Sequence, residues 1–479
     1  MITTDAVTPV PLAGDLSTGT ESTIVRAPYD QAELGRVPAL TAGDVDRAVR
    51  AARKALETEP LPQWRRADIL DRAAAELTRR SEQFAVTIAR EAAKPIRTAR
   101  SEVERAVSTL QFSAAVARQL TGDVVPLDAS AAGAGRIGFT LRVPVGVVGA
   151  IAPFNFPLNL VVHKVGPAIA AGCPVVLKPA GQTPFSSILL ARMLIDDCGL
   201  PPGYLHVVTG SGSVVGNALV DHDEVALITF TGSPEVGWGI RARAPRKRVG
   251  LELGNNAPLI LEPDGDWATA VEKVRIAGFS HAGQSCISTQ RLLVHSSLAG
   301  EVTEALAAAI GTLVVGDPLD ETTDVSALIS VAERDRVAGL LDDARGRGAT
   351  IAAGGDIRTD GVLSPTLVAG ARPDMRVCTE EVFGPVVAVT PYDTLDEALR
   401  LANDTRYGLQ AGIFTARLDT ALRAARGLDF GGIIINDVPT WRADQQPYGG
   451  VRDSGNTREG PAWSVREMTE ERLIVLPAA

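Results

Sequence analysis

The chain has few cysteines, and their spacing does not indicate a disulfide framework. Four of its 479 residues are cysteine, and no two of them show the C-x-x-C spacing. They are Cys173, Cys198, Cys286 and Cys378. Scattered thiols argue against a disulfide scaffold, and the lack of a Cys/His cluster argues against a zinc site. We therefore expect a reducing, cytoplasmic compartment and no metal ion.

Long apolar runs and an excess of positive charge are also missing. No segment approaches the ~18 uninterrupted apolar residues of a membrane span. The first residues lack the basic and apolar regions of a secretory signal. The formal net charge is −10, and acidic proteins are repelled by phosphate backbones and anionic lipids. Neither a nucleic acid nor a membrane is expected as a partner.

The chain does contain enough apolar sequence for large packed domains. Hydrophobic residues make up 45% of it, and its length suggests two or three domains at ~150 residues each. Apolar residues at three- and four-residue spacing predict mainly helix in the first 125 residues, at 40–57, 67–93 and 99–119. Pro95 interrupts this pattern as a helix stop would.

Beyond residue 145, short apolar runs alternate with helical segments. Strands are predicted at 145–152, 174–179, 205–210, 226–232 and 247–254, and in a second series at 258–261, 291–295 and 431–436. This alternation indicates βαβ units and parallel sheets in two α/β domains. The tail at 471–479 is strand-like, which is typical of pairing with another element or subunit.

One loop is typical of a turn that binds phosphate. Residues 231–237 (TGSPEVG) follow an apolar strand and open a helix. Gly232 and Gly237 would let the backbone approach a ligand, and a helix N-terminus favours an anion. An ordinary turn between a strand and a helix explains the same glycines equally well.

Four side chains could carry chemistry, although each also has a structural explanation. Cys286 lies in an irregular junction that could expose a thiol, but a lone cysteine is more often a small buried residue. Glu252 is the one charge in an apolar stretch, where it is either a desolvated general base or an outward-facing residue. Asn155 follows a strand in a turn, where asparagine is common. Lys178 ends a strand, either at a ligand site or in solvent.

These residues belong to an ordered set of motifs. The set comprises APFNFP at 152–157, KPA with TP at 178–184, FTGSPEVG at 230–237, LELG at 251–254, GQSC at 283–286, EEVFGPV at 380–386 and PYGGVRDSG at 447–455. From about residue 24 to 476 the chain therefore resembles the aldehyde dehydrogenase superfamily. Its pattern is most similar to the branch of lactaldehyde, phosphonoacetaldehyde and non-phosphorylating glyceraldehyde-3-phosphate dehydrogenases.

The resemblance implies an α/β, aldehyde dehydrogenase-like fold. A Rossmann-like cofactor-binding domain would comprise 1–125 and 145–254, and an α/β catalytic domain would comprise 255–445. A small β oligomerisation element would combine 126–144 with 465–479. The family implies a homodimer or a homotetramer.

The resemblance also implies a catalytic sequence. Cys286 would attack the aldehyde to form a thiohemiacetal, and the Asn155 amide with the Cys286 backbone N–H would stabilise the oxyanion. Hydride transfer would leave a thioester, which Glu252 would hydrolyse by activating water. The presence of Glu252 favours release of a free acid over transfer to coenzyme A. A catalytically inactive, structural relative would be expected to lack one of these three residues.

The cofactor implied is NAD or NADP. The residues that the resemblance assigns to it are Lys178, Gly181, Gly232, Ser233, Gly237, Glu381 and Phe383. Lys178 would hold the adenosine ribose, Ser233 the pyrophosphate and Glu381 the nicotinamide ribose, while Phe383 would support the nicotinamide ring. NAD-specific members usually carry glutamate where this chain has Gly181. We therefore expect that either cofactor is used.

The substrate side predicts a small polar aldehyde. Aromatic residues are only 4% of the chain, and Arg442 and His163 stand where relatives that take apolar aldehydes place aromatic residues. The residues assigned to the substrate are Arg105, Asn159, His163, Ser285 and Arg442. Arginine can hold a carboxylate or a phosphonate with two hydrogen bonds, so a small anionic aldehyde is expected.

Each of these assignments has an alternative. Arg442 could be a salt-bridged loop residue, and Arg105 could lie on an exposed helix face, paired with Glu102 or Glu104. His163 could be packed in the core. Members that clamp a phosphate often have arginine before the nucleophile, where this chain has Ser285. Oxidation of lactaldehyde, a semialdehyde or a neutral aldehyde, with Arg442 structural, is the alternative function.

Overall fold

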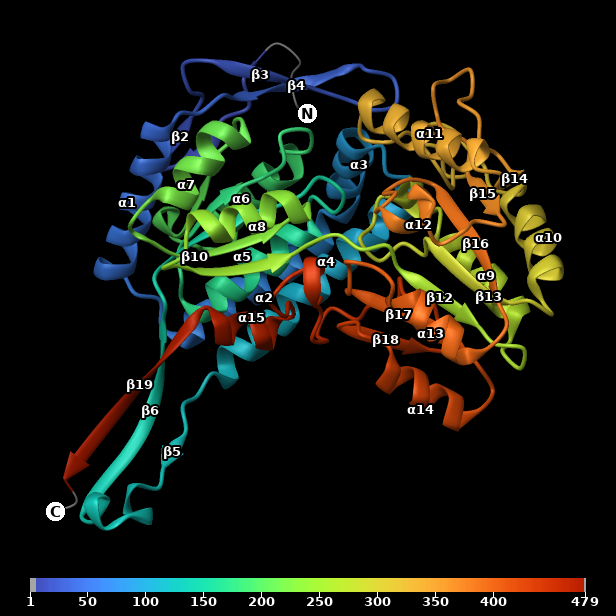
Figure 1. The fold of residues 1–479 in the computed structure, drawn as a ribbon. Coiled ribbons are helices and arrows are strands. Elements are labelled where there is room, and N and C mark those ends of the chain that lie inside the picture. The colour runs from blue at the N-terminus through green and yellow to red at the C-terminus, as the bar shows by residue number, and fades with distance from the viewer. Residues whose placement is uncertain (1–5, 478–479) are drawn as a thin grey trace.

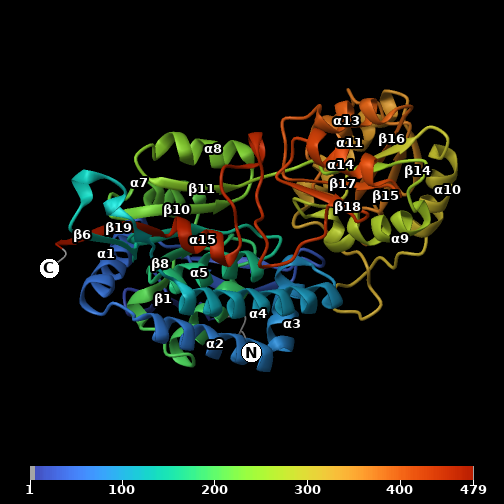
Figure 2. The ribbon, with the colours of Figure 1, turned by 90° about the horizontal axis from the view of Figure 1, so that it is seen from below.

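Two lobes and a projecting arm make up the structure, a computed structural model that describes residues 6–477 (Figure 1). Each lobe has a central sheet with helices around it, and Figure 2 shows the two lobes side by side. This confirms the expected α/β class. No helix in the described range is long and apolar enough to cross a membrane.

The first lobe is built on a sheet of five parallel strands, in the order β11-β10-β7-β8-β9. The strands are β7 (Val147–Ile151), β8 (Val175–Lys178), β9 (Leu205–Val207), β10 (Val225–Thr231) and β11 (Arg248–Glu252). The helices between them are α5 (Asn159–Ala171), α6 (Phe185–Asp196), α7 (Asn217–Asp221) and α8 (Pro234–Arg243). All five strands predicted in this part of the chain are confirmed. The parallel arrangement brings Lys178, Thr231 and Glu252 to the carboxyl edge of the sheet, where ligands bind in such folds.

Four helices precede this sheet, and here the expectations were partly wrong. They are α1 (Ala42–Thr58), α2 (Gln63–Arg79), α3 (Ser81–Ala92) and α4 (Ile96–Gln119). Thr41 caps α1 through a reciprocal pair of hydrogen bonds with Asp44, and the stop at Pro95 is confirmed. The single helix expected at 67–93 is broken at Arg80, where the backbone leaves the helical region with ψ at 17°.

The second error concerns the residues before 40, which were expected to be mainly helical. They form two antiparallel hairpins, β1 (Val10–Leu12) with β2 (Asp15–Ser17) and β3 (Ser22–Arg26) with β4 (Glu33–Pro38). These strands are short, and most of their positions are exposed or half-buried. Such strands leave little hydrophobic alternation in a sequence, so the pattern did not reveal them.

The second lobe contains a sheet of seven strands, in the order β14-β15-β16-β13-β12-β17-β18. The strands are β12 (Pro258–Leu261), β13 (Arg291–His295), β14 (Thr350–Ala353), β15 (Thr366–Ala369), β16 (Val386–Tyr392), β17 (Gln410–Phe414) and β18 (Gly432–Ile435). The helices are α9 (Trp267–Ala277), α10 (Ala299–Ile310), α11 (Val331–Gly346), α12 (Arg376–Thr379), α13 (Leu395–Asn403) and α14 (Leu418–Gly427). Only β14 runs antiparallel to its neighbour among these seven strands. The three strands expected here are confirmed, and the other four had not been predicted.

The arm is a three-stranded antiparallel sheet that projects from the first lobe (Figure 1). It consists of β5 (Val124–Val125), β6 (Arg136–Pro144) and β19 (Thr469–Pro477), the last of which follows α15 (Pro461–Glu467). The register pairs Thr469 with Pro144 and Pro477 with Arg136. The strand-like tail therefore pairs with another element, as expected. Several large apolar side chains of the arm are exposed, among them Ile137, Leu141, Leu473 and Leu476.

A buried ion pair holds the start of α5, which lies beside the site described below. The Glu102 carboxylate accepts hydrogen bonds from the backbone N–H groups of Leu158 and Asn159, each at 3.0 Å. The same carboxylate pairs with Lys94, and both side chains are fully buried. Lys94 Nζ also lies 3.8 Å from the centroid of the Phe156 ring. The pair thus anchors the segment that runs from β7 into α5.

Lys94→Met is expected to destabilise the protein by ~3–5 kcal/mol, because it leaves a buried carboxylate without its cation. The measurement is urea unfolding followed by fluorescence and circular dichroism. Arg72→Met is the control, since Arg72 pairs with Asp68 on the surface of α2 and should matter little. Equal effects of the two substitutions would contradict an anchoring role for the buried pair.

Candidate active site

Cys286 lies on an irregular segment between the lobes. The preceding 3₁₀ turn, Ser280–Gly283, contains three residues with positive φ: 51° at His281, 53° at Ala282 and 69° at Gly283. A Cβ at Gly283 would lie 2.0 Å from the Gly384 carbonyl oxygen, so only glycine fits there. This strained turn presents a half-buried thiol, whereas the other three cysteines are buried.

The Asn155 amide lies beside the same segment. Its Nδ2 donates a hydrogen bond to the Gln284 carbonyl at 2.9 Å, and the side chain is buried. Asn155 Oδ1 has no hydrogen-bond partner among the described residues. The structure thus places the amide that is predicted to stabilise the oxyanion next to the segment that contains Cys286.

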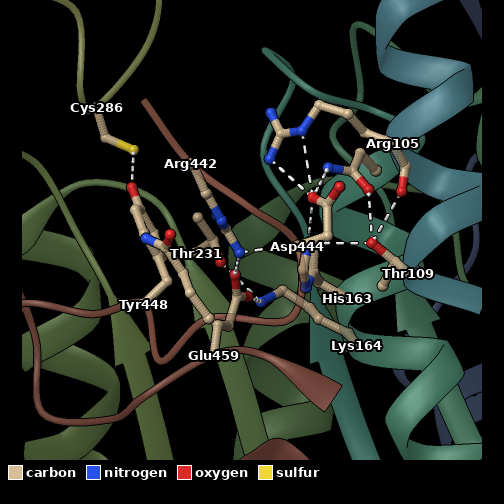
Figure 3. Close-up of polar contacts among 12 residues, drawn as sticks. Arg105, Thr109, His163, Lys164, Thr231, Cys286, Arg442, Asp444, Tyr448 and Glu459 are labelled. Carbon is tan, nitrogen blue, oxygen red and sulfur yellow. Dashed lines mark hydrogen bonds and ion pairs between the residues drawn. The ribbon is translucent and has the colours of Figure 1, made fainter. Parts of the chain in front are cut away.

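The Cys286 thiol contacts a tyrosine that the sequence reasoning had not selected. Cys286 Sγ and Tyr448 Oη are 2.9 Å apart (Figure 3). Burial raises the pKa of the thiol to about 12, and the hydrogen bond with Tyr448 acts in the opposite direction. In the sequence, Tyr448 belongs to the PYGG motif that contributes to the resemblance, but the motif assigns no function to its hydroxyl.

Glu252 ends β11 in a dry environment. It is 3% exposed, and neither carboxyl oxygen has a hydrogen-bond partner in the part of the chain that the structure describes. Burial raises its pKa well above the usual value, and the nearby Glu459 carboxylate raises it further. The backbone at Gly449 is so close that a Cβ there would lie 2.7 Å from Glu252 Oε1. The sequence reasoning had selected this carboxyl group as a possible desolvated base.

Glu459 is the centre of a second group of charges. Lys164 Nζ donates to Glu459 Oε1 at 3.1 Å and to Thr231 Oγ1 at 2.7 Å. Arg442 Nη2 donates to Glu459 Oε2 at 3.2 Å (Figure 3). Although burial acts to raise the pKa of Glu459, Lys164 and the neighbouring cations lower it to about 2. Sequence reasoning missed Glu459 and Lys164, because their pairing joins residues 295 apart in the chain.

Arg442 is buried between this carboxylate and the tyrosine. Its guanidinium lies over the Tyr448 ring, 3.7 Å from the centroid, and its side chain is 5% exposed. Within residues 6–477, Arg442 Nε has no hydrogen-bond partner. The alternative of a salt-bridged loop arginine is therefore correct as far as Glu459 is concerned, but this ion pair does not use the Nε–H group.

The other predicted substrate residues gather around Asp444 (Figure 3). Asp444 Oδ1 accepts from Arg105 Nη2 at 2.9 Å and from Asn159 Nδ2 at 3.4 Å, and it lies 3.3 Å from His163 Nε2. Burial acts to raise the pKa of Asp444, but His163 and Arg105 lower it to about 2. Sequence reasoning missed this carboxylate, although it lies only two residues after Arg442. The structure does not form the alternative pairing of Arg105 with Glu102.

Ser285 differs from these residues, because its contacts are local. Its Oγ accepts a hydrogen bond from the Ile287 N–H at 3.4 Å, and the residue is half-buried. Serine at this position supplies no cation beside Cys286.

The predicted cofactor residues line the edge between the lobes. Glu381 is half-buried and accepts a hydrogen bond from the Asn255 N–H at 2.8 Å, and desolvation raises its pKa to about 7. Phe383 has a φ of 47° and packs edge-on against Phe154, with ring centroids 5.9 Å apart. A Cβ at Gly254 would lie 2.4 Å from Glu381 Oε2, so the backbone is close to the carboxylate.

The remaining cofactor residues lie farther along the first lobe. Burial lowers the pKa of Lys178, whose Nζ donates only to the Pro179 carbonyl among the described residues. Gly181 lines a cavity of about 620 Å³, and a Cβ there would meet nothing within 4 Å. Ser233 caps α8 by accepting from the Val236 N–H, and Gly237 lets that helix pack against Leu253.

Comparison with known proteins identifies this arrangement. The family model described as "Aldehyde dehydrogenase family" matches residues 16–474. The chain belongs to the aldehyde dehydrogenase family. It is 45% identical to the 3-sulfolactaldehyde dehydrogenase of Priestia aryabhattai over 464 residues, which cover 97% of this chain and 96% of that protein.

Two solved structures of aldehyde dehydrogenases show the same fold. Aldehyde dehydrogenase 21 from Physcomitrella patens, in complex with the reaction product succinate, is 36% identical with a TM-score of 0.95, covering 100% of this chain and 99% of that one. The NADP-dependent glyceraldehyde-3-phosphate dehydrogenase from Bacillus halodurans, complexed with NADP, is 35% identical with a TM-score of 0.96, covering 99% and 100%. The expectation of an NAD- or NADP-dependent aldehyde dehydrogenase is confirmed, and an inactive relative is set aside.

The residues of this aldehyde dehydrogenase fit a dinucleotide. The cavity at Gly181 is open, the Lys178 ammonium group has one carbonyl partner, and the N-terminus of α8 can receive an anion. The Glu381 carboxyl group uses only Oε1 in the hydrogen bond with Asn255. These groups are of the kind that would bind ribose hydroxyls and phosphate.

Gly181→Glu is expected to raise the dissociation constant of NADPH by tenfold or more and to change that of NADH less. A carboxylate placed in this open space would repel a 2′-phosphate, and tenfold corresponds to about 1.4 kcal/mol. Fluorescence titration with both cofactors is the measurement. Gly300→Glu adds the same charge at another open glycine, on α10, and serves as the control. Equal weakening of both cofactors would contradict placement of Gly181 beside the 2′ position.

Proposed function

We propose that this aldehyde dehydrogenase oxidises a small anionic aldehyde to its carboxylic acid through Cys286 and Glu252. The observation that carries the anionic preference is the buried Arg442. Its Nε has no hydrogen-bond partner in residues 6–477, although the side chain is only 5% exposed. A buried guanidinium N–H without an acceptor is costly, and a carboxylate, sulfonate or phosphonate oxygen would satisfy it.

The charge balance around the site supports this proposal. The Asp444 and Glu459 carboxylates, whose pKa values are lowered, form ion pairs with Arg105, Lys164 and Arg442. Burial raises the pKa of Glu252, which disfavours the charged form of that carboxyl group. Three cations therefore face two carboxylates in these ion pairs, and an anionic substrate would complement them.

The relatives also favour a small anionic substrate. One is named for 3-sulfolactaldehyde, a sulfonate, and one solved structure contains succinate, a dicarboxylate. Binding of a phosphate group between several cations is less well supported, because Ser285 supplies no cation beside the nucleophile.

In the proposed reaction, the Cys286 thiol loses its proton to solvent base. Sγ then forms a bond to the carbonyl carbon, and the π electrons move to the oxygen. The Asn155 amide and the Cys286 backbone N–H would stabilise the resulting oxyanion. The dinucleotide, when bound, accepts the hydride; Lys178, Ser233 and Glu381 would hold it, with Phe383 beside the ring. The carbon then remains on Sγ as a thioester.

Glu252 would complete the reaction as a general base. Its carboxylate takes a proton from a water molecule, the oxygen attacks the thioester carbon, and Sγ leaves as a thiolate. Burial raises the pKa of Glu252, which makes the carboxylate a stronger base for this step.

We also propose that the protein assembles as a homodimer or homotetramer through its arm. The exposed apolar side chains of β6 and β19 support this, because solvent-facing apolar strands are typical of interfaces. In this proposal 126–144 and 465–479 form the oligomerisation element. The cofactor-binding domain comprises 1–125 and 145–254, and the catalytic domain comprises 255–445. Residues 446–464 then lie outside these ranges, although they carry Tyr448 and Glu459.

A second candidate is oxidation of lactaldehyde or another neutral aldehyde, with Arg442 purely structural. The ion pair of Arg442 with Glu459 favours it. A relative named lactaldehyde dehydrogenase, from Methanococcus aeolicus, is 36% identical over 456 residues.

Wild-type kcat/KM is expected to be ~10-fold or more higher for an anionic aldehyde than for its neutral isostere, equivalent to about 1.4 kcal/mol. Arg442→Gln should remove most of this preference, because the free guanidinium N–H and its charge are lost. Steady-state kinetics with matched aldehydes and both cofactors is the measurement. The exposed Arg417→Gln is the control. A preference that survives in Arg442→Gln, or its absence in the wild type, would favour the second candidate.

Glu252→Gln is expected to give a burst of reduced cofactor of at most one equivalent per site, followed by a slow steady rate. The amide cannot accept a proton from water, so the thioester would accumulate. Stopped-flow absorbance measures the burst, and Cys286→Ala should show none while still binding cofactor. A steady rate equal to that of the wild type would remove Glu252 as the deacylation base.

A further inference from the structure

The hydrogen bond between Cys286 and Tyr448 suggests a catalytic contribution beyond the residues above. While the thiol is protonated, either group can be the donor across the 2.9 Å contact. Once Sγ is ionised, only the phenol carries a proton. We propose that Tyr448 is a catalytic residue that donates this hydrogen bond to the Cys286 thiolate, and that the Arg442 guanidinium stacked on its ring strengthens the donor. The inference rests on the proposed function of Cys286 as the nucleophile.

The surroundings of the contact make the hydrogen bond strong. Cys286 packs against an apolar cluster formed by Ile287, Leu409 and Tyr448, and the tyrosine is 3% exposed. Among residues 6–477, Tyr448 is the one hydrogen-bond partner of Cys286 Sγ. A donor in such a dry environment stabilises an anion more than it would in water.

The hydroxyl is held in place by a closed set of contacts. The backbone of Tyr448 forms two hydrogen bonds with that of Glu459, with N···O distances of 2.9 and 2.6 Å. The Glu459 carboxylate pairs with Arg442, and Arg442 lies over the Tyr448 ring. Each of the three residues therefore fixes the other two, and the phenol cannot swing away from Sγ without breaking this set.

The charges that face the thiol act in opposite directions. The Glu381 and Glu252 carboxyl groups disfavour a thiolate, whereas Tyr448 and Arg442 favour it. A cation over the face of a phenol withdraws electron density from the ring, so the O–H becomes a better donor. Arg442 can thus act on the sulfur both directly and through the phenol.

Tyr448 remains protonated while it does this. Burial raises its pKa well above the usual value, and the neighbouring thiol and Glu252 add to the shift. The phenol moves no electron pair and gives up no proton; it shifts the acid–base equilibrium of Cys286, whose proton passes to solvent base. Its effect is to increase the fraction of thiolate at neutral pH.

The test is the pH dependence of Cys286 alkylation by iodoacetamide in the full-length enzyme, without aldehyde or cofactor. Mass spectrometry of the Cys286 peptide gives the rate. In Tyr448→Phe the midpoint is expected to rise by about one pH unit, which is a tenfold loss of thiolate at neutral pH, with little change in the rate at high pH. A purely structural hydroxyl would lower stability and leave the midpoint unchanged, and that result would overturn the proposal.

A matched control and a double variant sharpen the result. Tyr392→Phe removes another buried hydroxyl, which donates to the Leu261 carbonyl in the second lobe, and it should leave the midpoint unchanged. Arg442→Gln should raise the midpoint, and by less in the Tyr448→Phe background if the cation acts through the phenol. Equal shifts in both backgrounds would overturn that part of the proposal.

The experiments distinguish a failure of the inference about Tyr448 from a failure of the proposed function. Cofactor binding verifies that each variant is folded. If Cys286→Ala abolishes turnover but Tyr448→Phe leaves the midpoint unchanged, only the inference about the tyrosine fails. If Cys286→Ala retains dehydrogenase activity, the nucleophile assignment itself fails.

Discussion

The active-site structure depends on one buried carboxylate, that of Glu459, held between two cations. Lys164 comes from α5 in the first lobe, and Arg442 comes from the loop that leaves the second lobe. Without Glu459, two unpaired cations would lie in a dry region beside Glu252, and such an arrangement is strongly destabilising. The same carboxylate adds to the effect of burial in raising the pKa of Glu252 and, through Arg442, holds the Tyr448 ring. One ion-pair network thus couples the base, the predicted substrate residue and the thiol contact.

The unsatisfied polar atoms of the structure also indicate where a ligand belongs. Buried side-chain atoms normally have hydrogen-bond partners, and exceptions need a reason. In residues 6–477, several exceptions lie on Asn155, His163, Glu252 and Arg442. These residues belong to the proposed active site, and their unpaired atoms include both donors and acceptors. Folding alone would favour pairing these atoms, and the proposed substrate and the attacking water would supply partners for them.

The sequence predicted the parts of this structure whose signal is local. Continuous apolar runs predicted the strands β7 and β8, and contiguous motifs identified Cys286 and Glu252 as candidate catalytic residues. The β1–β4 hairpins were missed because short, half-exposed strands have weak periodicity. Asp444, Tyr448 and Glu459 were missed for a different reason. Their functional importance comes from contacts with residues on other elements. A local sequence pattern does not predict which of several acidic residues will pair with an arginine.

Arg442 shows how two interpretations of one residue can both be true. An arginine has a flat face, and its planar edge carries several N–H groups. In this chain the face lies on Tyr448, one terminal nitrogen pairs with Glu459, and Nε remains without a partner. A structural ion pair therefore does not use up the capacity of the side chain to bind a ligand. Lysine could replace the charge opposite Glu459, but it could not at the same time cover the ring with a flat cation and offer a second, fixed N–H. This geometry makes arginine, rather than positive charge alone, the requirement at position 442.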